Sequence, residues 1–524
     1  MIFLGCLNLD NRKLKMSKEQ KSKIIYISVS TIVIWVITHG YRFMNNLYTC
    51  DALIEVFQDD ILFQRSLGRF MHPLVMVMRG CISNPWFIGI LSLFFMTASA
   101  YFTAEILNID NPFVLILLSG LLICNNTLIS SVAGFLPWMD VYTITLFLAV
   151  IGVWFYEKDK LYGYILGSIS FVCCMGFYQA YIDVAFALFV IITVKKLAEK
   201  NELNKILLKT LKTVGALLAS GISYYAVYKI VCKLHHINVT SSYHGLTQVS
   251  NFENTSLLTV FLDTYKLFFK FLFSPETFVS TILLGIRVSN VWKVLLNAGL
   301  VCCILAILAG LVAINIKNKI KISQIILEII GLLLFPFAAN FVCFMSKGIE
   351  HELMIYSFVF IYVFALLIID LITKESKKKI YKYLLLIPFL IFIWNGFVYA
   401  NQVYFKIDME DRAAVSIATR IIDDIEDVEG YEAGVTPVRF VGALDRSDYM
   451  EPIIYLKDVT VNGNYNTPFT YERSLPFYLK YYLNVKINVF DAPVSSDALA
   501  TMPCYPNEGS IQYIDDVLVI KISE

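Results

Sequence analysis

About eleven apolar segments, each close to the length of a membrane-crossing helix, constrain the fold of this chain more than any other feature. A bilayer core of roughly 30 Å requires about 20 apolar residues in helical conformation. The segments lie approximately at residues 24–44, 86–107, 112–131, 140–156, 161–176, 178–194, 211–231, 291–315, 324–345, 353–373 and 380–399. Hydrophobic residues make up 57% of the 524 residues and charged residues 16%, which excludes an ordinary soluble globular protein. The sequence therefore predicts a polytopic α-helical membrane protein.

Lysine and arginine in the short loops indicate which ends of the predicted spans face the cytoplasm. If the spans alternate in direction, the basic groups fall on one side, namely those at residues 12–23, 158–160, 195–212, 317–321 and 374–382. This interpretation requires the run 161–194 to be a hairpin that turns at Gly176–Tyr181. It also treats 195–212 as a solvated helix that orients the next span. We expect a cytoplasmic N-terminus, held by an uncleaved first span, and outer loops that carry most of the polar residues.

The composition changes after residue 399. From Asp408 onward the chain has 20 acidic and 9 basic residues. A helical pattern at 411–428 and strand-like runs at 438–444, 485–490 and 512–522, the last with a turn at Asp515–Asp516, predict a small α/β domain. We therefore predict a membrane domain at 1–399 and an extracytoplasmic α/β domain at 400–524. Within the membrane domain, 45–85 is the first outer loop, and 233–290 is an outer interfacial segment with an amphipathic helix at 257–273.

The first outer loop is unusually polar for a segment between two apolar spans. It contains Asp51, Glu55, Asp59, Asp60, Arg65, Arg69, His72 and Arg79. Charges at a membrane surface are costly unless they face water or an ionic ligand. A lipid-linked sugar phosphate is such a ligand, because arginine or lysine binds phosphate and a carboxylate can accept the proton of an attacking hydroxyl. The adjacent pair Asp59–Asp60 fits a helix N-terminal cap equally well.

Several short motifs resemble those of the bacterial glucosyltransferase GtrII-like membrane proteins. They are Cys50-Asp51-Ala52-Leu53, Asp59-Asp60, Ser66-Leu67-Gly68-Arg69-Phe70 with Pro73, Pro85-Trp86-Phe87, Asp140-Val141-Tyr142, Gly176-Phe177-Tyr178-Gln179-Ala180, and Ala400-Asn401 through Arg420-Ile421-Ile422. The chain has Cys50 where the resemblance leads us to expect a histidine. The resemblance implies a GT-C-like glycosyltransferase that takes a sugar from an undecaprenyl-phosphate carrier and adds it to a surface polysaccharide, such as O-antigen or teichoic acid, outside the cell.

The resemblance and the residues together give candidate roles. Asp51 is the expected catalytic base, because similar enzymes keep an acidic residue in this loop, and Asp60 and Asp59 are the alternatives. The donor phosphate is expected to bind Arg69, Arg65, Lys347 and His351. The sugar or the acceptor is expected to bind Asp140, Tyr178, Gln179 and His72. For Arg65 and Arg79, contact with lipid headgroups is an equal alternative.

No metal site or cofactor is expected, although a divalent cation, Mg²⁺ or Mn²⁺, stays open. The pair His351-Glu352 lacks the spacing of a zinc-binding helix. The expected partners are a polyprenyl-phosphate-linked sugar, a surface glycan and membrane lipid, with a donor synthase and a small flippase as further candidates and no nucleic acid. The resemblance places the chain in the bacterial plasma membrane.

Two other functions compete with hexosyl transfer. A transporter or flippase of lipid-linked saccharides would carry its key charges within the spans, whereas here they concentrate in outer loops. A membrane scaffold would use the acidic tail to bind partners, and the charges of the loop would be structural.

Overall fold

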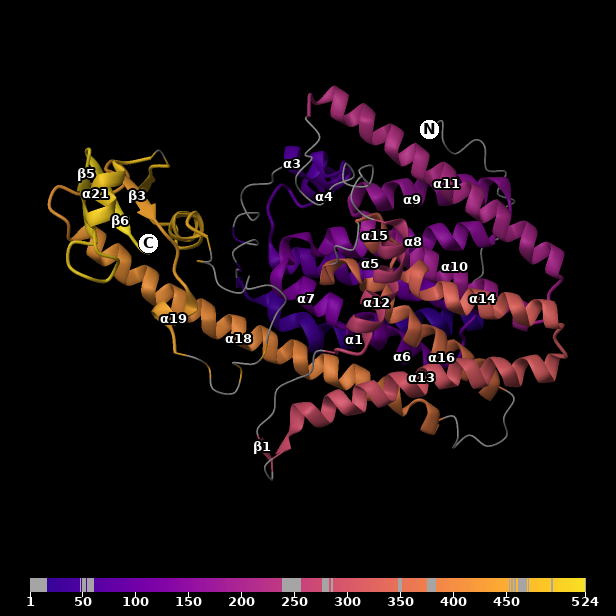
Figure 1. Cartoon of the computed structure of the whole chain (residues 1–524). Helices are drawn as coiled ribbons and strands as arrows, with labels where there is room; N and C mark the ends of the chain where they lie inside the picture. The colour runs from indigo at the N-terminus through magenta and orange to yellow at the C-terminus, as the bar shows by residue number, and fades with distance from the viewer. Residues whose placement is uncertain are drawn as a thin grey trace.

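The computed structural model is a bundle of helices from which one long helix leads to a small sheet at the C-terminal end (Figure 1). It describes residues 17–47, 49, 53, 61–237, 256–275, 282–283, 286–346, 351–374, 383–451, 453, 456, 459, 469, 471–491 and 493–523.

Among these residues, eight helices are long and apolar enough to cross a membrane. They are α1 (Lys18–Met44), α5 (Pro85–Leu107), η1 with α8 (Leu136–Trp138 and Met139–Glu157), α11 (Leu203–Leu234), α13 (Val288–Asn318), α14 (Ile322–Ala339), η4 with α16 (Tyr356–Val359 and Phe360–Thr373) and α18 (Ile387–Glu426). A ninth span results if the bent pair α6 (Pro112–Ile123) and α7 (Asn126–Gly134) is one span. The chain is therefore a polytopic helical protein of the kind that crosses membranes.

Within the described residues, all eleven apolar segments of the sequence overlap helices of the structure. Two of them, α9 (Leu161–Phe177) and α10 (Ile182–Ala198), have only 17 residues each. Such helices are at the lower limit for crossing a bilayer. The count of eleven spans therefore stays a prediction.

The hairpin predicted at Gly176–Tyr181 is present. Helix α9 ends at Phe177, the short helix η2 covers Gln179–Tyr181, and α10 follows directly. At the far end of α10, Lys196 forms an ion pair with Glu157 at the end of α8, with Nζ 2.5 Å from Oε2. The turn at Gln179–Tyr181 and the basic residues around Lys196 thus lie at opposite ends of α10.

The basic segment 195–212 is not one helix, which corrects the sequence interpretation. Helix α10 ends at Ala198 and α11 begins at Leu203. Between them Lys200 adopts φ +63°, a left-handed conformation that ends a right-handed helix. The lysines of this segment therefore come from two helices that meet at one end of the bundle.

A 45° bend separates α6 from α7 inside the bundle. The amide of Asn125 caps both halves, because its oxygen accepts from Leu128 N at 3.0 Å and its nitrogen donates to the carbonyls of Leu121 and Leu122. The hydroxyl of Tyr356 donates to the Leu122 carbonyl at 2.8 Å. Polar side chains thus replace the helical hydrogen bonds that the bend removes, as a low-dielectric interior requires.

The most enclosed spans are α8 and α16, whereas α11 and α13 lie at the periphery. In the apolar window of η4 with α16, 83% of the residues are buried, against 17% in that of α11. The predicted amphipathic helix is α12 (Leu257–Leu272), which buries Val260, Thr264, Phe268 and Leu272 along one side. It packs on α14 and α15 (Phe341–Met345). The two-stranded hairpin of β1 (Ile282–Leu283) and β2 (Ile286–Arg287) precedes α13.

The tail begins inside one continuous 40-residue helix. The boundary expected at residues 399 and 400 falls within α18, which joins the last apolar segment to the predicted helix 411–428. The sheet has the strand order β4-β3-β6-β5. Its strands are β3 (Pro437–Val441), β4 (Asn488–Val489), β5 (Ile511–Ile514) and β6 (Val517–Lys521), accompanied by α19 (Arg446–Tyr449), α20 (Ser474–Phe477), η5 (Tyr478–Tyr482) and α21 (Ser496–Thr501).

The sheet agrees with the strand-like runs of the sequence. Strands β5 and β6 pair antiparallel around Asp515 and Asp516, whose φ angles are +49° and +64°. Positive φ at both central residues is typical of two-residue hairpin turns. The turn predicted at these two residues is therefore confirmed.

Candidate functional site

Four of the predicted site residues, Asp51, Asp59, Asp60 and Lys347, lie outside the described residues, so their roles stay predictions. The other seven are described. They come from α3 (Ile61–Ser66), the turn after it, α4 (His72–Met78), the start of α8, the α9–α10 turn and η3 (Glu352–Met354).

The turn between α3 and α4 is fixed onto the α9–α10 hairpin. Gly68 has φ +87°, a conformation that favours glycine. The amide of Met71 donates to the Gly176 carbonyl at 2.9 Å, and a Cβ at Gly176 would lie 2.7 Å from the Met71 side chain. The Tyr224 hydroxyl of α11 donates to the Gly68 carbonyl at 3.1 Å. Because both glycines are needed for this contact, the motifs around Gly68 and Gly176 form one structural unit.

Arg69 is held between this turn and Tyr178. Its Nη1 donates to Gln64 Oε1 at 2.9 Å, and its Cζ lies 4.8 Å from the centre of the Tyr178 ring. This is a cation–π geometry. Within the described part of the chain, the Nε atoms of Arg69 and Arg65 are buried and have no hydrogen-bond partner. Two arginines near one turn thus offer N–H groups to an anionic ligand.

Gln179 connects the hairpin to the first loop. Its amide nitrogen donates to the Leu67 carbonyl at 2.7 Å and to the Tyr224 hydroxyl at 2.9 Å. Both N–H groups are therefore engaged within the protein. If Gln179 binds a sugar, as the sequence predicts, its carbonyl oxygen is the group that accepts the hydrogen bond.

Arg79 and Asp140 form a buried ion pair close to the same turn. Arg79 Nε lies 3.6 Å from Asp140 Oδ2, and each side chain is 1% exposed. Arg79 also donates to the Pro137 carbonyl and contacts the sulfur of Met76. Asp140 Oδ1 accepts from Val141 N at 2.9 Å. Both charges are thus withdrawn from solvent, and the predicted contact of Asp140 with the acceptor stays untested.

A series of contacting aromatic rings leads from Arg69 into the interior of the helical bundle. The ring of Tyr142, one position after Val141 on α8, lies 5.2 Å from that of Tyr178 and stacks on Tyr181 at 6.1 Å. Tyr181 stacks in turn on Tyr356 at 5.4 Å. Sequence reasoning missed Tyr142, Tyr181 and Tyr356 as part of the site, although Tyr142 belongs to a quoted motif and Tyr181 ends the predicted hairpin turn. We call Arg69, Arg79, Asp140, Tyr178 and Gln179 the outer cluster, because the sequence predicts that this end of the bundle faces outward.

His351 and His72 lie on other elements near the end of the bundle that is predicted to face outward. His351 caps η3 with Nδ1, which accepts from Leu353 N at 3.3 Å, and its ring lies 5.9 Å from that of Phe135. Glu352, next to it, accepts from Ser130 on α7 at 2.8 Å. His72 begins α4 and is buried. None of these contacts joins His351 to Arg69 directly.

The described part of the chain contains no group of three or more His, Cys, Asp or Glu side chains arranged to hold a metal ion. The acidic residues of the first loop are outside that part, so a divalent cation at the site stays an open prediction.

A second polar group, also missed from the sequence, lies where the tail meets the bundle. The hydroxyls of Tyr478 and Tyr482 donate to the two oxygens of Asp411, at 3.2 Å and 2.9 Å. Tyr482 also donates to the Asn46 carbonyl after α1. Asp411 lies 24 residues into α18, or roughly 36 Å along it, beyond the apolar half. Burial raises the pKa of Asp411 to about 6, which the two tyrosine hydrogen bonds oppose.

The first loop starts at this junction. The Thr49 hydroxyl donates to the Gly134 carbonyl at the end of α7, and Leu53 is buried in the core of the tail. The two residues flank the predicted base in the sequence. Thr49 therefore contacts the end of α7, and Leu53 packs in the tail.

The fold and the outer cluster define a polytopic membrane protein with a fixed, arginine-bearing turn at one end of the bundle. The family model described as glucosyl transferase GtrII matches residues 40–369, more than half of the chain. The chain belongs to this glycosyltransferase family, and the match spans the whole outer cluster. A search of curated proteins and of solved structures gives no match.

Proposed function

We propose that this protein transfers a hexose, with glucose as the first candidate, from a polyprenyl-phosphate carrier to a glycan outside the bacterial plasma membrane. The observation that carries the proposal is the turn at Gly68–Arg69, whose guanidinium is positioned over Tyr178 and keeps a buried N–H without a partner among the described residues. A membrane-embedded carrier phosphate is the ligand that suits a fixed arginine at the end of a helical bundle.

In the proposed reaction, Arg69 and Arg65 bind the donor phosphate. Asp51 takes the proton of an acceptor hydroxyl, whose oxygen attacks the anomeric carbon. The bond from this carbon to the phosphate oxygen breaks as the new glycosidic bond forms, and the carrier leaves as its phosphate monoester. Attack from the opposite side inverts the anomeric configuration. The proton stays on Asp51 until solvent removes it.

The remaining members of the outer cluster support this arrangement. Tyr178 offers a ring face and Gln179 a carbonyl oxygen to the sugar. The buried pair of Arg79 and Asp140 holds α4 against α8 and so fixes the arginine turn that precedes α4. The proposed catalyst needs no nucleotide-sugar site, because the carrier lipid delivers the activated sugar.

Two substitutions test the proposal with purified protein and a synthetic polyprenyl-phosphate sugar. Asp51→Asn removes the base and is expected to lower the turnover number by at least 100-fold. Arg69→Gln removes the cation and is expected to lower kcat/KM for the donor by about 10- to 100-fold. Lys229→Gln is the matched control, since Lys229 also lies over a tyrosine ring, at 5.3 Å from Tyr225, but outside the cluster.

Parental activity in a folded Asp51→Asn variant would reject the assigned base. Parental activity in Arg69→Gln would reject the donor site. Movement of intact donor across vesicles without transfer would favour the flippase. Repeating the assay with EDTA decides whether a divalent cation takes part.

A further inference from the structure

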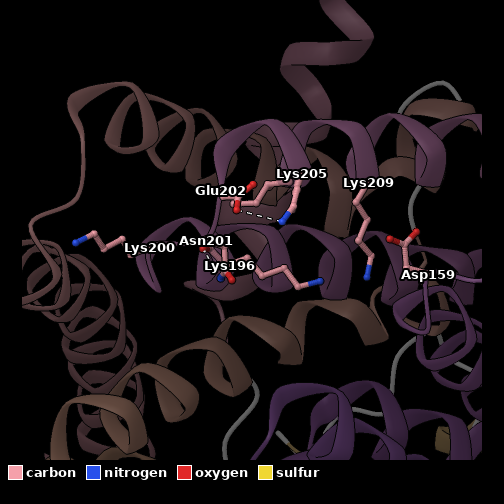
Figure 2. Close-up of a pocket in the computed structure, with 8 residues that line it drawn as sticks. Asp159, Lys196, Lys200, Asn201, Glu202, Lys205 and Lys209 are labelled. Atoms are coloured by element: carbon pink, nitrogen blue, oxygen red, sulfur yellow. Dashed lines mark hydrogen bonds and ion pairs between the residues drawn. The ribbon is translucent and has the colours of Figure 1, made fainter.

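A cleft of about 390 Å³ lies at the end of the bundle opposite to the outer cluster. It is lined by Asp159, Lys196, Lys200, Asn201, Glu202, Lys205, Ile206 and Lys209. Figure 2 shows Lys205 and Lys209 on one helix and Lys196 on a neighbouring one, with the amino groups of Lys196 and Lys209 directed toward the same space. The cleft therefore forms where α10 ends and α11 begins.

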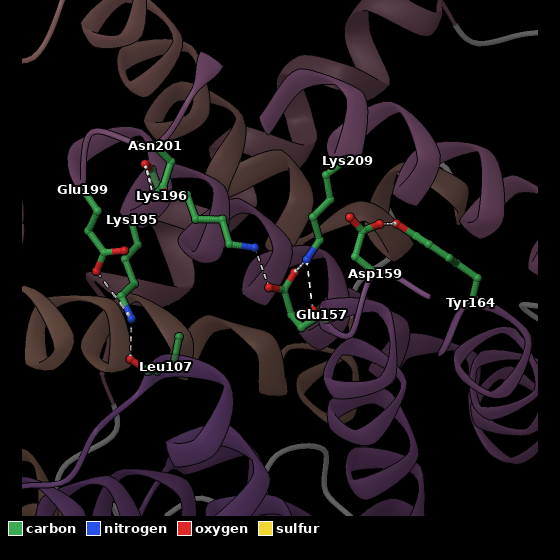
Figure 3. Close-up of polar contacts among 9 residues, drawn as sticks. All are labelled: Leu107, Glu157, Asp159, Tyr164, Lys195, Lys196, Glu199, Asn201 and Lys209. Carbon is green, nitrogen blue, oxygen red and sulfur yellow. Dashed lines mark hydrogen bonds and ion pairs between the residues drawn. The ribbon is translucent and has the colours of Figure 1, made fainter. Parts of the chain in front are cut away.

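The lysines of the cleft exceed the carboxylates that contact them. Glu157 alone binds two of them, with Lys196 Nζ 2.5 Å from Oε2 and Lys209 Nζ 2.9 Å from Oε1 (Figure 3). The Lys196 side chain is 28% and the Lys209 side chain 17% exposed, so both ammonium groups are partly withdrawn from water. One carboxylate cannot balance two such charges, and this favours binding of an anion.

The two carboxylates that line the cleft, Asp159 and Glu202, are already engaged. Asp159 accepts from the Tyr164 hydroxyl at 2.9 Å and lies 3.7 Å from Lys212 Nζ. Lys205 is paired with Glu202 at 3.1 Å. Lys200 lines the cleft as well, on the left-handed residue between the two helices. The cleft thus keeps a positive excess beyond the pair of lysines on Glu157.

Apolar side chains continue from the cleft along the outside of the bundle. On α11, Leu207, Leu208 and Leu211 are exposed, as are Leu161 and Tyr162 at the start of α9. Only 17% of the residues in the apolar window of α11 are buried within the protein. A ligand with a phosphate in the cleft and a hydrocarbon chain against α11 would satisfy both surfaces. A basic pocket beside an exposed transmembrane helix is a known way to bind an anionic headgroup.

We propose that this cleft binds the phosphate headgroup of an anionic membrane lipid, with the acyl chains lying along α11. The site is separate from the proposed donor site, because the two lie at opposite ends of α8, near Asp140 and Glu157. Lys196 and Lys209 bind the phosphate oxygens, and Lys200 adds positive charge at the rim. The proposal does not depend on the glycosyltransferase assignment.

Native mass spectrometry of the full-length protein in detergent tests the site with phosphatidylglycerol, phosphatidylcholine and inorganic phosphate as probes. We expect retention of one phosphatidylglycerol in preference to phosphatidylcholine. Lys196→Gln should weaken it by about fivefold, the effect of one surface lysine on an anionic headgroup. This variant keeps Lys209 paired with Glu157 and is expected to fold. Glu157→Gln should strengthen phosphatidylglycerol binding, since it frees two lysines.

Lys319→Gln is the matched control, because Lys319 is exposed and does not line the cleft. It should bind phosphatidylglycerol like the parent. Equal retention of the two lipids, or a preference unchanged in Lys196→Gln, would overturn the site. If inorganic phosphate binds in the cleft and phosphatidylglycerol does not, the lipid assignment is wrong.

Discussion

At the scale of single residues, the buried pair of Arg79 and Asp140 is the strongest electrostatic constraint on the outer cluster. Removing one partner leaves an uncompensated buried charge, which typically costs about 3–5 kcal/mol of stability. We expect Arg79→Ala and Asp140→Ala each to lower the free energy of unfolding by an amount of this order, seen as a lower unfolding temperature in detergent. The double variant Arg79→Met/Asp140→Leu should recover most of the loss, because apolar side chains of similar volume replace the pair.

Activity of this double variant separates a structural role from a binding role. If the pair only holds α4 against α8, transfer recovers together with stability. If Asp140 contacts the acceptor, stability recovers and transfer does not. A double variant less stable than either single one would contradict the structural role.

The residue scale also shows what the sequence could predict about the site. Arg69 and Tyr178 were both candidates, because a charged residue after glycine and an aromatic turn are visible in the sequence. Their stacking at 4.8 Å, and the pairing of Arg79 with Asp140 at 3.6 Å, depend on how α4 packs against α8 and the hairpin. No local pattern encodes such long-range contacts, so these partners were not predictable from one sequence.

At the scale of elements, α18 connects the bundle to the tail, and Asp411 is its point of attachment. The folded-state pKa of Asp411 is raised to about 6 from an ordinary 3.8, mainly by burial. Compared with the unfolded chain, the folded protein therefore favours the protonated form of Asp411. The stability that this form contributes is fully present below about pH 4 and is lost as the pH rises through 6.

We expect Asp411→Asn, which mimics the protonated form, to unfold at a higher temperature than the parent at pH 8. The difference should shrink toward zero near pH 4. Thermal unfolding across this range measures it. Asp423→Asn on the same helix is the control, because Asp423 is exposed. A difference independent of pH would show that Asp411 is not neutralised by folding.

Elements were easier to predict than their ends. The composition changes near residue 400 because the chain leaves the apolar region, but a change in polarity does not end a helix, and α18 continues across it. Conversely, the basic segment 195–212 has uniform composition and is split at Lys200, because one left-handed residue ends α10. Hydrophobic pattern predicts where helices lie, and backbone conformation decides where they stop.

At the scale of the whole molecule, the orientation of the bundle in the membrane decides on which side each of the two proposed sites lies. A membrane-impermeant amine reagent applied to intact cells tests it. We expect labelling of Lys480 and Lys486, which are exposed in the tail, and protection of Lys158 and Lys319 until the cells are lysed. If Lys158 and Lys319 alone were labelled in intact cells, the bundle would have the opposite orientation, and the outer cluster would face the cytoplasm.

The helix α18 also has a mechanical consequence. Its 40 residues make a rod about 60 Å long. The buried residues of its first half, up to Ile407, lie in the core of the bundle, and those of its second half, from Ala414, lie in the core of the tail. If the second half tilts by about 10° where it leaves the bundle, its far end, roughly 30 Å away, moves by about 5 Å, the pitch of one helical turn. A small tilt of the membrane segment thus displaces the tail, and a force on the tail is transmitted back to the bundle through the same helix.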